Sequence, residues 1–557
     1  MKFNHLIGVI ALSSTPIMVN AAAYEVQELP VSDLSANQFG GSIDNTGLVL
    51  TTLANPFSPP IDLSLLDVTL FPGLTDPDGA AQGDFNITDY TFLVNTFRGN
   101  AANFSTFGQK LSSTLIYQTD GTDAEYVFGF DEQRDSTNGF TFSINASLAG
   151  SANGEYIVGS SPSVFYPVPF TDSDGNDFVA VISDFLQRGF VQYQGNVNPL
   201  MPMDDTLSGF SRPTAINENL QVVGISSVAP RQVVLDGIEA CNGDDVPVPL
   251  EVCLYDLEGR LTSISIASGA ITQFDTRATL WQLDAQGQVV SQEAFDLTFE
   301  PAEDDTFPYS NEAQDINNNG IAVGSGPVIS NEDSRFSAAM VFENSTTRRL
   351  LENDELLPNF ATGINDQNLV VGYQRPVING RPVNRLFTYD LNTEEFVSPL
   401  GFFGSSVTTP RDINNNGIVV GNAEVTGTNQ GPPRTAGFMY DSQNDSFVNL
   451  NDLTACDSPY EIVAANSIND SNEIVADATI VRPLRNVRGE PILDANGDAL
   501  TETTVLAVKL NPTGADAPDC GLVVDDETLV ERQGAGIGGF VLLMFSALLG
   551  FRRISAK

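Results

Sequence analysis

A ten-residue pattern of polar and aliphatic positions recurs along the chain. Its two best copies, residues 315–324 and 412–421, each read Asp-Ile-Asn-Asn-Asn-Gly, then three aliphatic residues and Gly. Looser copies begin at Ile43, Ile216, Ile364 and Ile468. Two apolar stretches on either side of a short polar turn are typical of a β-hairpin. The pattern therefore predicts one hairpin per copy.

The fifth position of the unit, with the leading Ile counted as the first, fixes where each turn is expected. It is Gly or Asn in all copies but one, and these residue types best tolerate a positive φ; they are Gly47, Gly320, Asn368, Gly417 and Asn472. Leu220 is the exception. There, the neighbouring Asn219 is expected to take the turn conformation.

A second, aromatic element follows the cleaner copies and ends in an acid. It reads Phe-Thr-Tyr-Asp at 387–390, Phe-Met-Tyr-Asp at 438–441 and Met-Val-Phe-Glu at 340–343, and 254–256 offers a shorter version. Alternating large side chains suit a half-buried strand. With the next polar turn and strand, each unit holds about four short strands in about 50 residues, the size of a propeller blade.

The spacing of the copies favours one architecture among all-β folds. The leading Ile residues 316, 364, 413 and 468 follow each other at steps of 48, 49 and 55 residues. A β-sandwich of similar hairpins has no reason to keep such a period, so we predict a β-propeller of about 6–8 blades over residues 24–512. An insertion is expected at about 225–310, and residues 513–533 are expected to be a linker.

The N-terminal part of this range carries worn copies. Residues 114–118 and 190–193 match the aromatic element, and 125–129 and 155–159 match the strand that ends in Gly. They predict two or three further blades. The only tryptophan, Trp281, is predicted to be a core residue of a strand; the alternative is a stacking platform for a sugar.

Composition removes several classes of function. The only histidine, His5, lies in a segment that we expect to be removed, so a Ser-His-Asp triad, a Cys-His dyad and a histidine-ligated metal are excluded from the mature protein. Asp and Glu number 71 against 25 Lys and Arg, which gives a formal charge of −46. Such a surface repels nucleic acid; we interpret the charge as a means of solubility in a salty exterior.

The two chain ends predict export. Residues 1–23 have Lys2, an apolar stretch and an Ala-Ala-Ala site before Tyr24, as in a secretory signal peptide. In an oxidising compartment, the four cysteines are expected to form disulfides, and three pairings are open; we favour Cys241–Cys253 and Cys456–Cys520.

The C-terminus predicts a membrane span. From Gly534 to Phe551, 18 residues carry no charge, and Arg552, Arg553 and Lys557 follow. This length just suffices to cross a bilayer, and the basic end is expected to stay cytoplasmic. The body would then lie on the outer side of that membrane.

These motifs carry resemblances to known families. The repeats resemble the HAF-type extracellular repeats of bacteria, in which an Ile-Asn-x-x-Gly-x-Val-Val-Gly segment is joined by an Arg-Ala-Phe-Leu-Trp-like strand; here residues 277–281 read Arg-Ala-Thr-Leu-Trp. The layout is similar to an uncharacterised domain-of-unknown-function family of secreted Gram-negative proteins. That likeness brings no known activity.

The tail resembles a GlyGly-CTERM sorting signal, carried here by Gly534, Gly536, Gly538, Gly539, Arg552 and Arg553. The resemblance implies cutting by a rhomboid-type sorting protease (rhombosortase) of the inner membrane and passage through type II secretion. The protein is then expected at the cell surface or outside the cell. Without that processing it would stay at the periplasmic face of the inner membrane.

One turn is a candidate metal site. Asp172, Asp174, Asn176 and Asp177 place oxygen ligands within one short loop, the ligand type that calcium prefers. The EF-hand pattern is not met, because Gly175 stands at the fourth position and Ser183 at the twelfth. The alternative is an ordinary Asp-Gly turn.

No catalytic residue can be chosen from the sequence. A carboxylate pair of a glycosidase is defined by its separation in space, and Asp256, Asp390 and Asp441 recur once per repeat, which indicates a role in turns. We therefore expect a surface-displayed or secreted binding module, with a polysaccharide or another envelope protein as partner. The alternatives are a secreted carbohydrate-active enzyme and a purely structural envelope protein.

Overall fold

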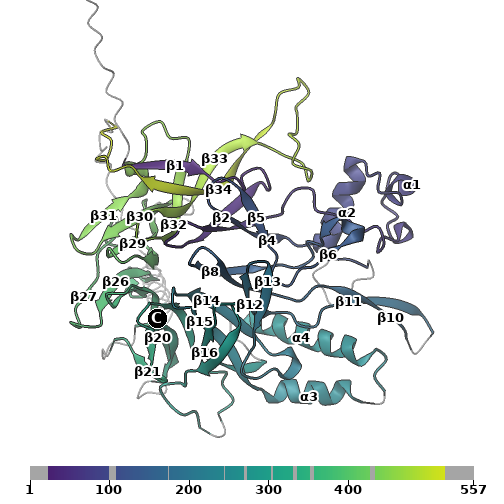
Figure 1. The fold of residues 1–557 in the computed structure, drawn as a ribbon, viewed down its shortest axis with the longest axis horizontal. Coiled ribbons are helices and arrows are strands. Elements are labelled where there is room, and N and C mark those ends of the chain that lie inside the picture. The colour runs from purple at the N-terminus through teal and green to yellow at the C-terminus, as the bar shows by residue number, and fades with distance from the viewer. Residues whose placement is uncertain are drawn as a thin grey trace, which may run out of the picture.

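The computed structural model describes residues 23–520 except 100–107, 173–174, 244, 269–272, 303–304, 330–334, 352–356 and 427–432. Seven four-stranded antiparallel sheets make up the body (Figure 1). Their first strands contact one another in a closed cycle, so the sheets are the blades of a β-propeller around a central channel. The predicted fold class is confirmed, and the number of blades is seven.

The first three blades are built from the N-terminal half of the chain. Blade 1 holds β2 (Asn37–Ile43), β3 (Val49–Ala54), β4 (Thr114–Thr119) and β5 (Ala124–Val127). Blade 2 holds β8 (Ser147–Ala152), β9 (Tyr156–Ser161), β12 (Arg188–Tyr193) and β13 (Asn196–Leu200). Blade 3 holds β14 (Ser211–Ile216), β15 (Gln221–Pro230), β16 (Phe274–Leu283) and β17 (Val289–Ala294).

The next three blades follow the clear repeats. Blade 4 holds β18 (Glu312–Ile316), β19 (Ala322–Ile329), β20 (Arg335–Glu343) and β21 (Thr346–Arg349). Blade 5 holds β22 (Asn359–Ile364), β23 (Leu369–Gln374), β26 (Arg385–Asp390) and β27 (Phe396–Val397). Blade 6 holds β28 (Thr408–Ile413), β29 (Ile418–Glu424), β30 (Thr435–Asp441) and β31 (Ser446–Asn449).

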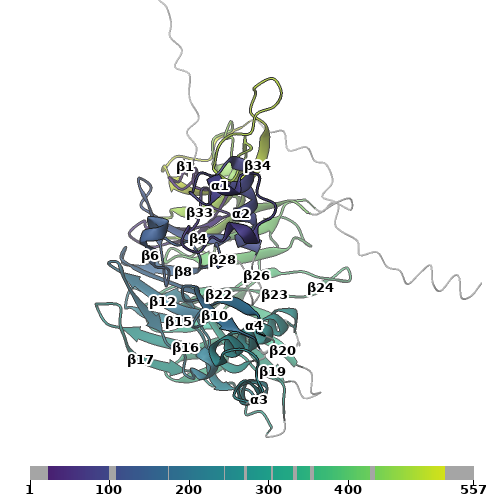
Figure 2. The same cartoon turned by 90° about the vertical axis from the view of Figure 1, so that its right-hand side faces the viewer.

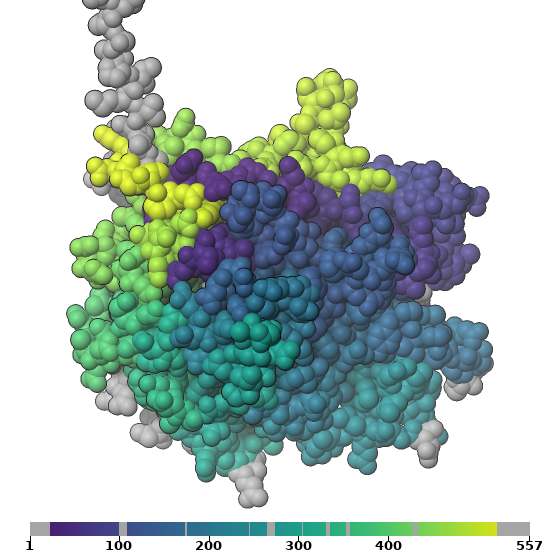
Figure 3. Space-filling model, in the orientation of Figure 1, coloured from purple at the N-terminus to yellow at the C-terminus, as the bar shows by residue number. Residues whose placement is uncertain are grey.

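Blade 7 closes the ring with a strand from the other end of the chain. It holds β32 (Glu461–Ile468), β33 (Ile474–Pro483) and β34 (Thr501–Pro512), and its outermost strand is β1 (Tyr24–Glu28), which pairs antiparallel with β34. Figure 3 shows these N-terminal (purple) and C-terminal (yellow) segments lying side by side.

The repeated motif forms the hairpin between the first and second strand of a blade. Gly417 and Asn472 have φ values of 75° and 60° in these turns, as the pattern predicted. In blade 3 the prediction for Asn219 is wrong: Leu220 itself has φ 58°. The residue that closes the motif is Gly because a β-bulge at Pro410/Asp412 and its equivalents presses the first strand against the second; a Cβ on Gly421 would lie 2.2 Å from the Thr409 carbonyl oxygen.

Apolar side chains fill the space between neighbouring blades. Val371 and Leu386 of blade 5, for example, pack against Val419, Phe438 and Tyr440 of blade 6. Trp281 is fully buried between blades 2 and 3, and its indole Nε1 donates a hydrogen bond of 2.9 Å to the Met201 carbonyl oxygen. The prediction that Trp281 is a core residue is confirmed.

The meander gives the propeller two different faces. Each repeat hairpin joins a first strand to a second strand and therefore lies at one end of the channel, which we call the ring face. Connections from second to third strands, and from one blade to the next, lie at the other end, the insertion face. The helices gather there, on the right in Figure 1 and towards the viewer in Figure 2.

Insertions on this face carry the remaining elements. They are η1 (Val68–Leu70), α1 (Pro77–Ala80) and α2 (Ile87–Gly99) after β3; β6 (Gln133–Arg134), η2 (Asp135–Thr137) and β7 (Gly139–Phe140) after β5; β10 (Tyr166–Thr171) and β11 (Asp177–Ile182) after β9; η3 (Thr206–Ser208) after β13; α3 (Gln232–Cys241) and α4 (Leu250–Ser268) after β15; and β24 (Val377–Ile378) and β25 (Arg381–Pro382) after β23. One further short helix, η4 (Leu450–Leu453), follows β31 in blade 6.

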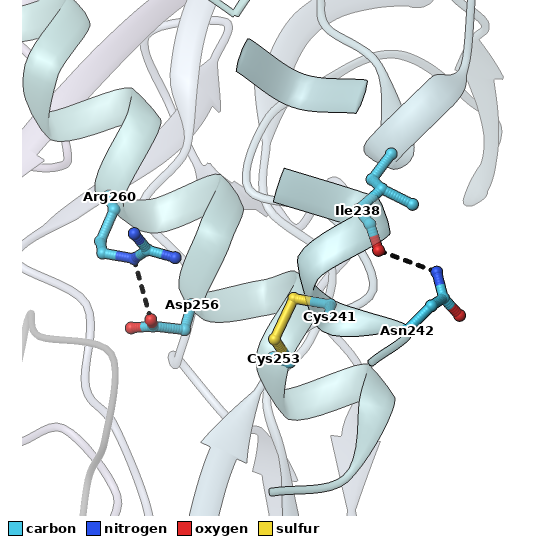
Figure 4. Close-up of a disulfide and its surroundings, with 6 residues drawn as sticks. All are labelled: Ile238, Cys241, Asn242, Cys253, Asp256 and Arg260. Atoms are coloured by element: carbon cyan, nitrogen blue, oxygen red, sulfur yellow. Dashed lines mark hydrogen bonds and ion pairs between the residues drawn. A yellow bond between two sulfur atoms is a disulfide. The ribbon is translucent and has the colours of Figure 1, made fainter. Parts of the chain in front are cut away.

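A disulfide joins the two helices inserted in blade 3. Cys241 ends α3 and Cys253 lies in the first turns of α4, with 5.7 Å between their Cα atoms (Figure 4). The strand predicted at 254–256 is wrong, because these residues lie within α4, where Asp256 pairs with Arg260 one turn later at 3.0 Å. The insertion is also narrower than 225–310, since β16 and β17 are strands of blade 3.

A second disulfide, Cys456–Cys520, ties blade 7 to the segment after β34. Both bridges agree with the pairing that we favoured. Within the described residues, no helix is long and apolar enough to span a membrane. The predicted signal sequence up to residue 22 and the predicted span and sorting signal at 534–557 lie outside the described residues.

Candidate functional site

The repeat hairpins form a ring of asparagine side chains at the mouth of the channel. The residue after the leading Ile is Asn in blades 3–7, and its Nδ2 donates to the backbone carbonyl oxygen of the equivalent residue in the next blade. The donors are Asn217, Asn317, Asn365, Asn414 and Asn469, with distances of 2.9, 3.0, 3.1, 2.9 and 3.2 Å. The last of them donates to Asp44, the equivalent residue of blade 1. Blades 3 to 7 and blade 1 are thereby hydrogen-bonded in series.

A second ring, one residue further on, alternates amides with carboxylates. Asn415 Nδ2 donates to both Asp366 and Asp470, at 3.0 and 2.9 Å. Asn45 of blade 1 donates through Nδ2 to Asp470 of blade 7 at 3.1 Å and to Glu218 of blade 3 at 2.8 Å. These contacts therefore connect blade 1 directly with blade 3. The three acids of the mouth are therefore used in contacts between blades.

Two further acids, Asp315 and Asp412, face the channel just below the rings. Asp315 accepts from the backbone N–H of Ile316 in its own blade and of Ile364 in the next, both at 2.8 Å. Asp412 makes the same bridge to Ile468 at 2.9 Å. Burial, with the charge of Asp412 as the second cause, raises the pKa of Asp315 to about 7; burial also raises that of Asp412.

The ring face is thus built for holding blades together. Its cavity is small, about 190 Å³, and polar. Within the described residues, no group of three or more His, Cys, Asp or Glu side chains is arranged to hold a metal ion. We look for a ligand site on the insertion face instead.

A large cavity lies on that face, over blades 3 and 4. It has a volume of about 690 Å³. Inner-strand residues of both blades form its floor, and α4 and the segment before β18 form its walls; we call it the insertion cleft. Its lining includes Gln187, Phe210, Arg212, Glu258, Thr262, Gln273, Phe274, Phe307, Tyr309, Ser310, Glu312, Ser325, Arg335, Phe336 and Ser337.

An aromatic and cationic group forms one wall of the cleft. The Arg335 guanidinium lies over the ring of Phe307, at 4.7 Å from its centroid, and its Nε donates to the Tyr309 hydroxyl at 2.8 Å. Tyr309 is buried, whereas Phe307 is 44% exposed. The ring of Phe307 therefore offers an aromatic surface held in place by two neighbours.

Two glutamates line the cleft in contrasting surroundings. Glu312 is paired with Arg212 across the first strands of blades 3 and 4, at 2.6 Å. Glu258 on α4 is buried, and its Oε1 accepts from the Leu186 N–H at 3.0 Å. Burial raises the pKa of Glu258 to about 8, against the opposing effects of this hydrogen bond and of Arg188. Glu258 is thus a neutral acid at pH 7.

The predicted calcium ligands lie elsewhere, at the tip of the β10–β11 hairpin. Asp172 accepts from the backbone N–H and side chain of Asn176, at 2.8 and 3.1 Å. Asp177 accepts from the Thr171 hydroxyl at 2.8 Å. Asp174 lies outside the described residues. These contacts are those of a hairpin turn, and the calcium site stays a prediction.

Two of the three recurring acids at the ends of the aromatic strands have the role in turns that their recurrence indicated. Asp390 accepts from the N–H groups of Asn392 and Thr393 in the following turn. Asp441 does the same for Gln443. Asp256 is different, because it lies on a helix.

The residues of the cleft were not found from the sequence. They come from insertions and strand starts that share no motif. One signal was present: insertions of a repeat array gather on one face, where binding sites often lie, and the interruption near 225–310 contributes Glu258, Thr262 and Phe307.

Fold and cleft together define a class of protein: a seven-bladed β-propeller with a ligand-sized cleft on its insertion face. The profile of the family described as "Protein of unknown function (DUF3466)" matches residues 2–554, and the chain belongs to this family. No match is found among curated proteins.

The solved structures that match the chain share little of its sequence. The acylaminoacyl peptidase of Pyrococcus horikoshii has 11% identity and a TM-score of 0.37, covering 82% of this chain and 51% of its own. The β-propeller domain of the Trilobed protease from Pyrococcus furiosus has 10% identity and a TM-score of 0.30, covering 65% and 93%. A protein of unknown function from Dyadobacter fermentans has 10% and 0.30, covering 74% and 97%. The chain thus spans about half the length of the P. horikoshii peptidase.

Proposed function

We propose that this protein is an exported binding module whose ligand occupies the insertion cleft. The observation that carries the proposal is the cleft itself: about 690 Å³, with an exposed aromatic ring beside several hydroxyl and amide groups. Cavities of this size with a few polar groups are typical of small-ligand sites. The ring face, by contrast, has its polar groups occupied by contacts between blades.

The chemistry of the cleft favours an uncharged saccharide. Sugar rings place C–H groups on aromatic faces, for which Phe307 is available, and their hydroxyls need hydrogen-bonding groups such as Ser325 and Ser337. The arginines of the cleft already have partners, because Arg212 pairs with Glu312 and Arg335 with Asp305. In a chain of charge −46, a polyanion would be repelled.

Phe307→Ala is expected to weaken saccharide binding about tenfold, because it removes the exposed ring. The measurement is isothermal calorimetry of the full chain with soluble neutral polysaccharides: a dextran, a mannan and a galactan. Phe396→Ala is the matched control, since Phe396 on β27 is similarly exposed (41%) and also packs on another ring. If all three polysaccharides fail to bind, or if both variants bind alike, the saccharide assignment is wrong.

One observation favours a carbohydrate-active enzyme as the second candidate. Glu258 is a neutral acid in the same cleft as Glu312, which is ion-paired with Arg212. Two carboxyl groups with different surroundings are what acid-base hydrolysis of a glycosidic bond needs. Release of reducing sugar that Glu258→Gln abolishes while binding persists would establish this alternative; binding without release supports the binding module.

Export remains part of the proposal. Two disulfides support an oxidising compartment, and β1 begins at Tyr24, the predicted first residue after the signal peptide. The tail with Gly538-Gly539 and Arg552-Arg553 would direct processing by a rhomboid-type protease and type II secretion. The repeats resemble HAF-type extracellular repeats, and this resemblance also supports export.

The native protein is expected to begin near Tyr24 and to end before Phe540 in the cell-surface or medium fraction. Intact mass and peptide mapping of both ends, for each cell fraction, test this expectation. An intact tail on a protein confined to the inner membrane would contradict the sorting signal. The protein would then act at the periplasmic face of that membrane, and its partners would be envelope components.

A further inference from the structure

A second cavity lies beside the insertion cleft, where the insertions meet blades 1 and 2. It has a volume of about 290 Å³, and Leu186 and Gln187 belong to its lining and to that of the cleft. Arg98 of α2 and Lys110 before β4 contribute the charged groups. No Asp or Glu side chain is among the described residues that line it. We call it the lysine pocket.

Lys110 is a buried ammonium group without a carboxylate partner among the described residues. It is only 8% exposed; its Nζ donates to the Tyr255 hydroxyl at 3.0 Å and lies 4.2 Å from the centroid of the Phe165 ring. Burial lowers the pKa of Lys110 to about 8, so that it is still mainly charged at pH 7. The carboxylate of Asp62 has other partners: it accepts a hydrogen bond from the Ser64 hydroxyl and forms an ion pair with Arg134.

Arg98 shares this property. Its guanidinium donates to the backbone carbonyl oxygens of Ser112 and Pro56, and none of the ion pairs in the described part of the chain includes it. The residues that follow it at 100–107 include no acid. The chain has 71 acids against 25 bases, so a basic side chain is expected to have an acidic partner. Two cations without such a partner at one cavity are therefore unusual for this chain.

The other body lysine shows what the composition normally provides. Lys509 is equally buried, at 7% exposed, but its Nζ lies 2.7 Å from a carboxylate oxygen of Glu473. An unpaired charge in such surroundings costs free energy unless something compensates it. Lys110 and Arg98 thus carry a cost that Lys509 does not.

A buried hydroxyl supplies a third, independent observation. Ser161, at the end of β9, is 2% exposed and lines the pocket, and its Oγ has no hydrogen-bond partner among the residues that the structure describes. Its neighbour Ser160 accepts from Gln187 at 3.3 Å. Buried hydroxyls normally have hydrogen-bond partners. The Ser161 hydroxyl is therefore available to donate a hydrogen bond to a bound ligand.

We propose that the lysine pocket binds the anionic group of a small ligand, with Lys110, Arg98 and Ser161 as its donors. The class is a carboxylate or a phosphate attached to an apolar or aromatic body, because Phe165, Leu111 and Pro162 give the lining an apolar part beside its serine and amide side chains. Charge-assisted hydrogen bonds from the two cations would offset their burial. This site is separate from the saccharide site proposed above and does not depend on it.

The test compares anions at constant ionic strength. Thermal unfolding of the full chain in chloride buffer is titrated with inorganic phosphate, phenyl phosphate, acetate and benzoate. We expect a saturable rise in the melting temperature with one head group, and a larger rise with its aromatic derivative. Phosphate and carboxylate ligands are distinguished by which pair is active. If no anion raises the melting temperature above the chloride baseline, the proposal is wrong.

The Lys110→Met variant distinguishes an anion-binding role of Lys110 from a purely structural one. Without ligand, this variant is expected to melt at a higher temperature than the wild type, because an uncompensated buried charge is gone, and the rise with the active anion should disappear. Lys509→Met, the matched control, is expected to melt lower and to keep the rise. A Lys110→Met protein that melts lower and responds to anions like the wild type would overturn the proposal.

Arg98→Gln decides the same question should Lys110→Met fail to fold. It keeps the side chain polar but removes the charge and the guanidinium donors, and we expect the active anion to bind roughly tenfold more weakly or worse. Unchanged anion affinity in Arg98→Gln would contradict the assignment. Saccharide binding in the cleft should be the same in both variants, so failure here and failure of the saccharide proposal can be told apart.

Discussion

Changing Asn414 to aspartate is expected to lower the free energy of unfolding by about 3 kcal/mol or more. Asn414 is 4% exposed, and its Oδ1 accepts from the backbone N–H groups of Asn416 and Ile418, both at 3.0 Å. Its Nδ2 donates to the carbonyl oxygens of Asn469 and of the Asn472 side chain, at 2.9 and 2.7 Å. Aspartate keeps the two accepted bonds but turns both donated bonds into contacts between oxygens, one of them charged.

Urea unfolding followed by fluorescence measures the effect, together with Asn414→Ala. The alanine variant removes the acceptor of two N–H groups, while the Asn469 and Asn472 carbonyl oxygens each keep another donor, and it adds no charge, so its loss should be smaller, about 2 kcal/mol. Asn444→Ala is the control, because Asn444 lies in an exposed turn and contacts only Asp441. A loss for Asn414→Asp no greater than for Asn444→Ala would show that the ring does not hold the blades together.

The sequence predicted the repeating unit because its pattern is local. Ten consecutive positions contain both the turn residue, such as Gly417 with φ 75°, and the alternating aliphatic residues. The asparagine ring depends on bonds between residues 48 to 425 positions apart, such as Asn317 to Asn365 and Asn469 to Asp44. The motif contained the donors, but only the closed ring shows what they bind.

Two local predictions failed for reasons that the structure explains. Residues 254–256 have the composition of an aromatic strand, but the preceding Cys253 is bonded to Cys241, and the segment packs as a helix against α3 through Leu257 and Leu261. Leu220 holds φ 58° because the hairpin of blade 3 has the same turn geometry as its neighbours. Tertiary contacts outweighed local preference in both places.

The candidate sites were beyond reach of the sequence for a different reason. Glu258 is one of 71 acids, and only burial between α4 and Leu186 distinguishes it. Lys110 was notable as one of two lysines between the terminal segments. Its lack of an acidic partner is a property of packing, which brings Phe165 and Tyr255 around it.

Glu258→Gln is expected to change how stability depends on pH. A glutamate in the unfolded chain releases its proton near pH 4.5, whereas burial holds the proton of Glu258 up to about pH 8 in the folded protein. Between these values the folded state binds one proton more than the unfolded state, so this group's contribution to stability falls as pH rises and its full cost is reached above pH 8. Glutamine has no such cost, and it retains an acceptor for the Leu186 N–H.

The variant should therefore match the wild type near pH 5 and be the more stable protein at pH 9, by on the order of 4 kcal/mol. Urea unfolding at both pH values gives this difference, in which the similar titration of Asp315 cancels because both proteins contain it. Glu25→Gln, an exposed change on β1, should show no such trend. Equal pH dependence of Glu258→Gln and wild type would mean that Glu258 is ionised in the folded state. The cleft would then lack the neutral acid on which the hydrolysis alternative rests, and that alternative would lose its support.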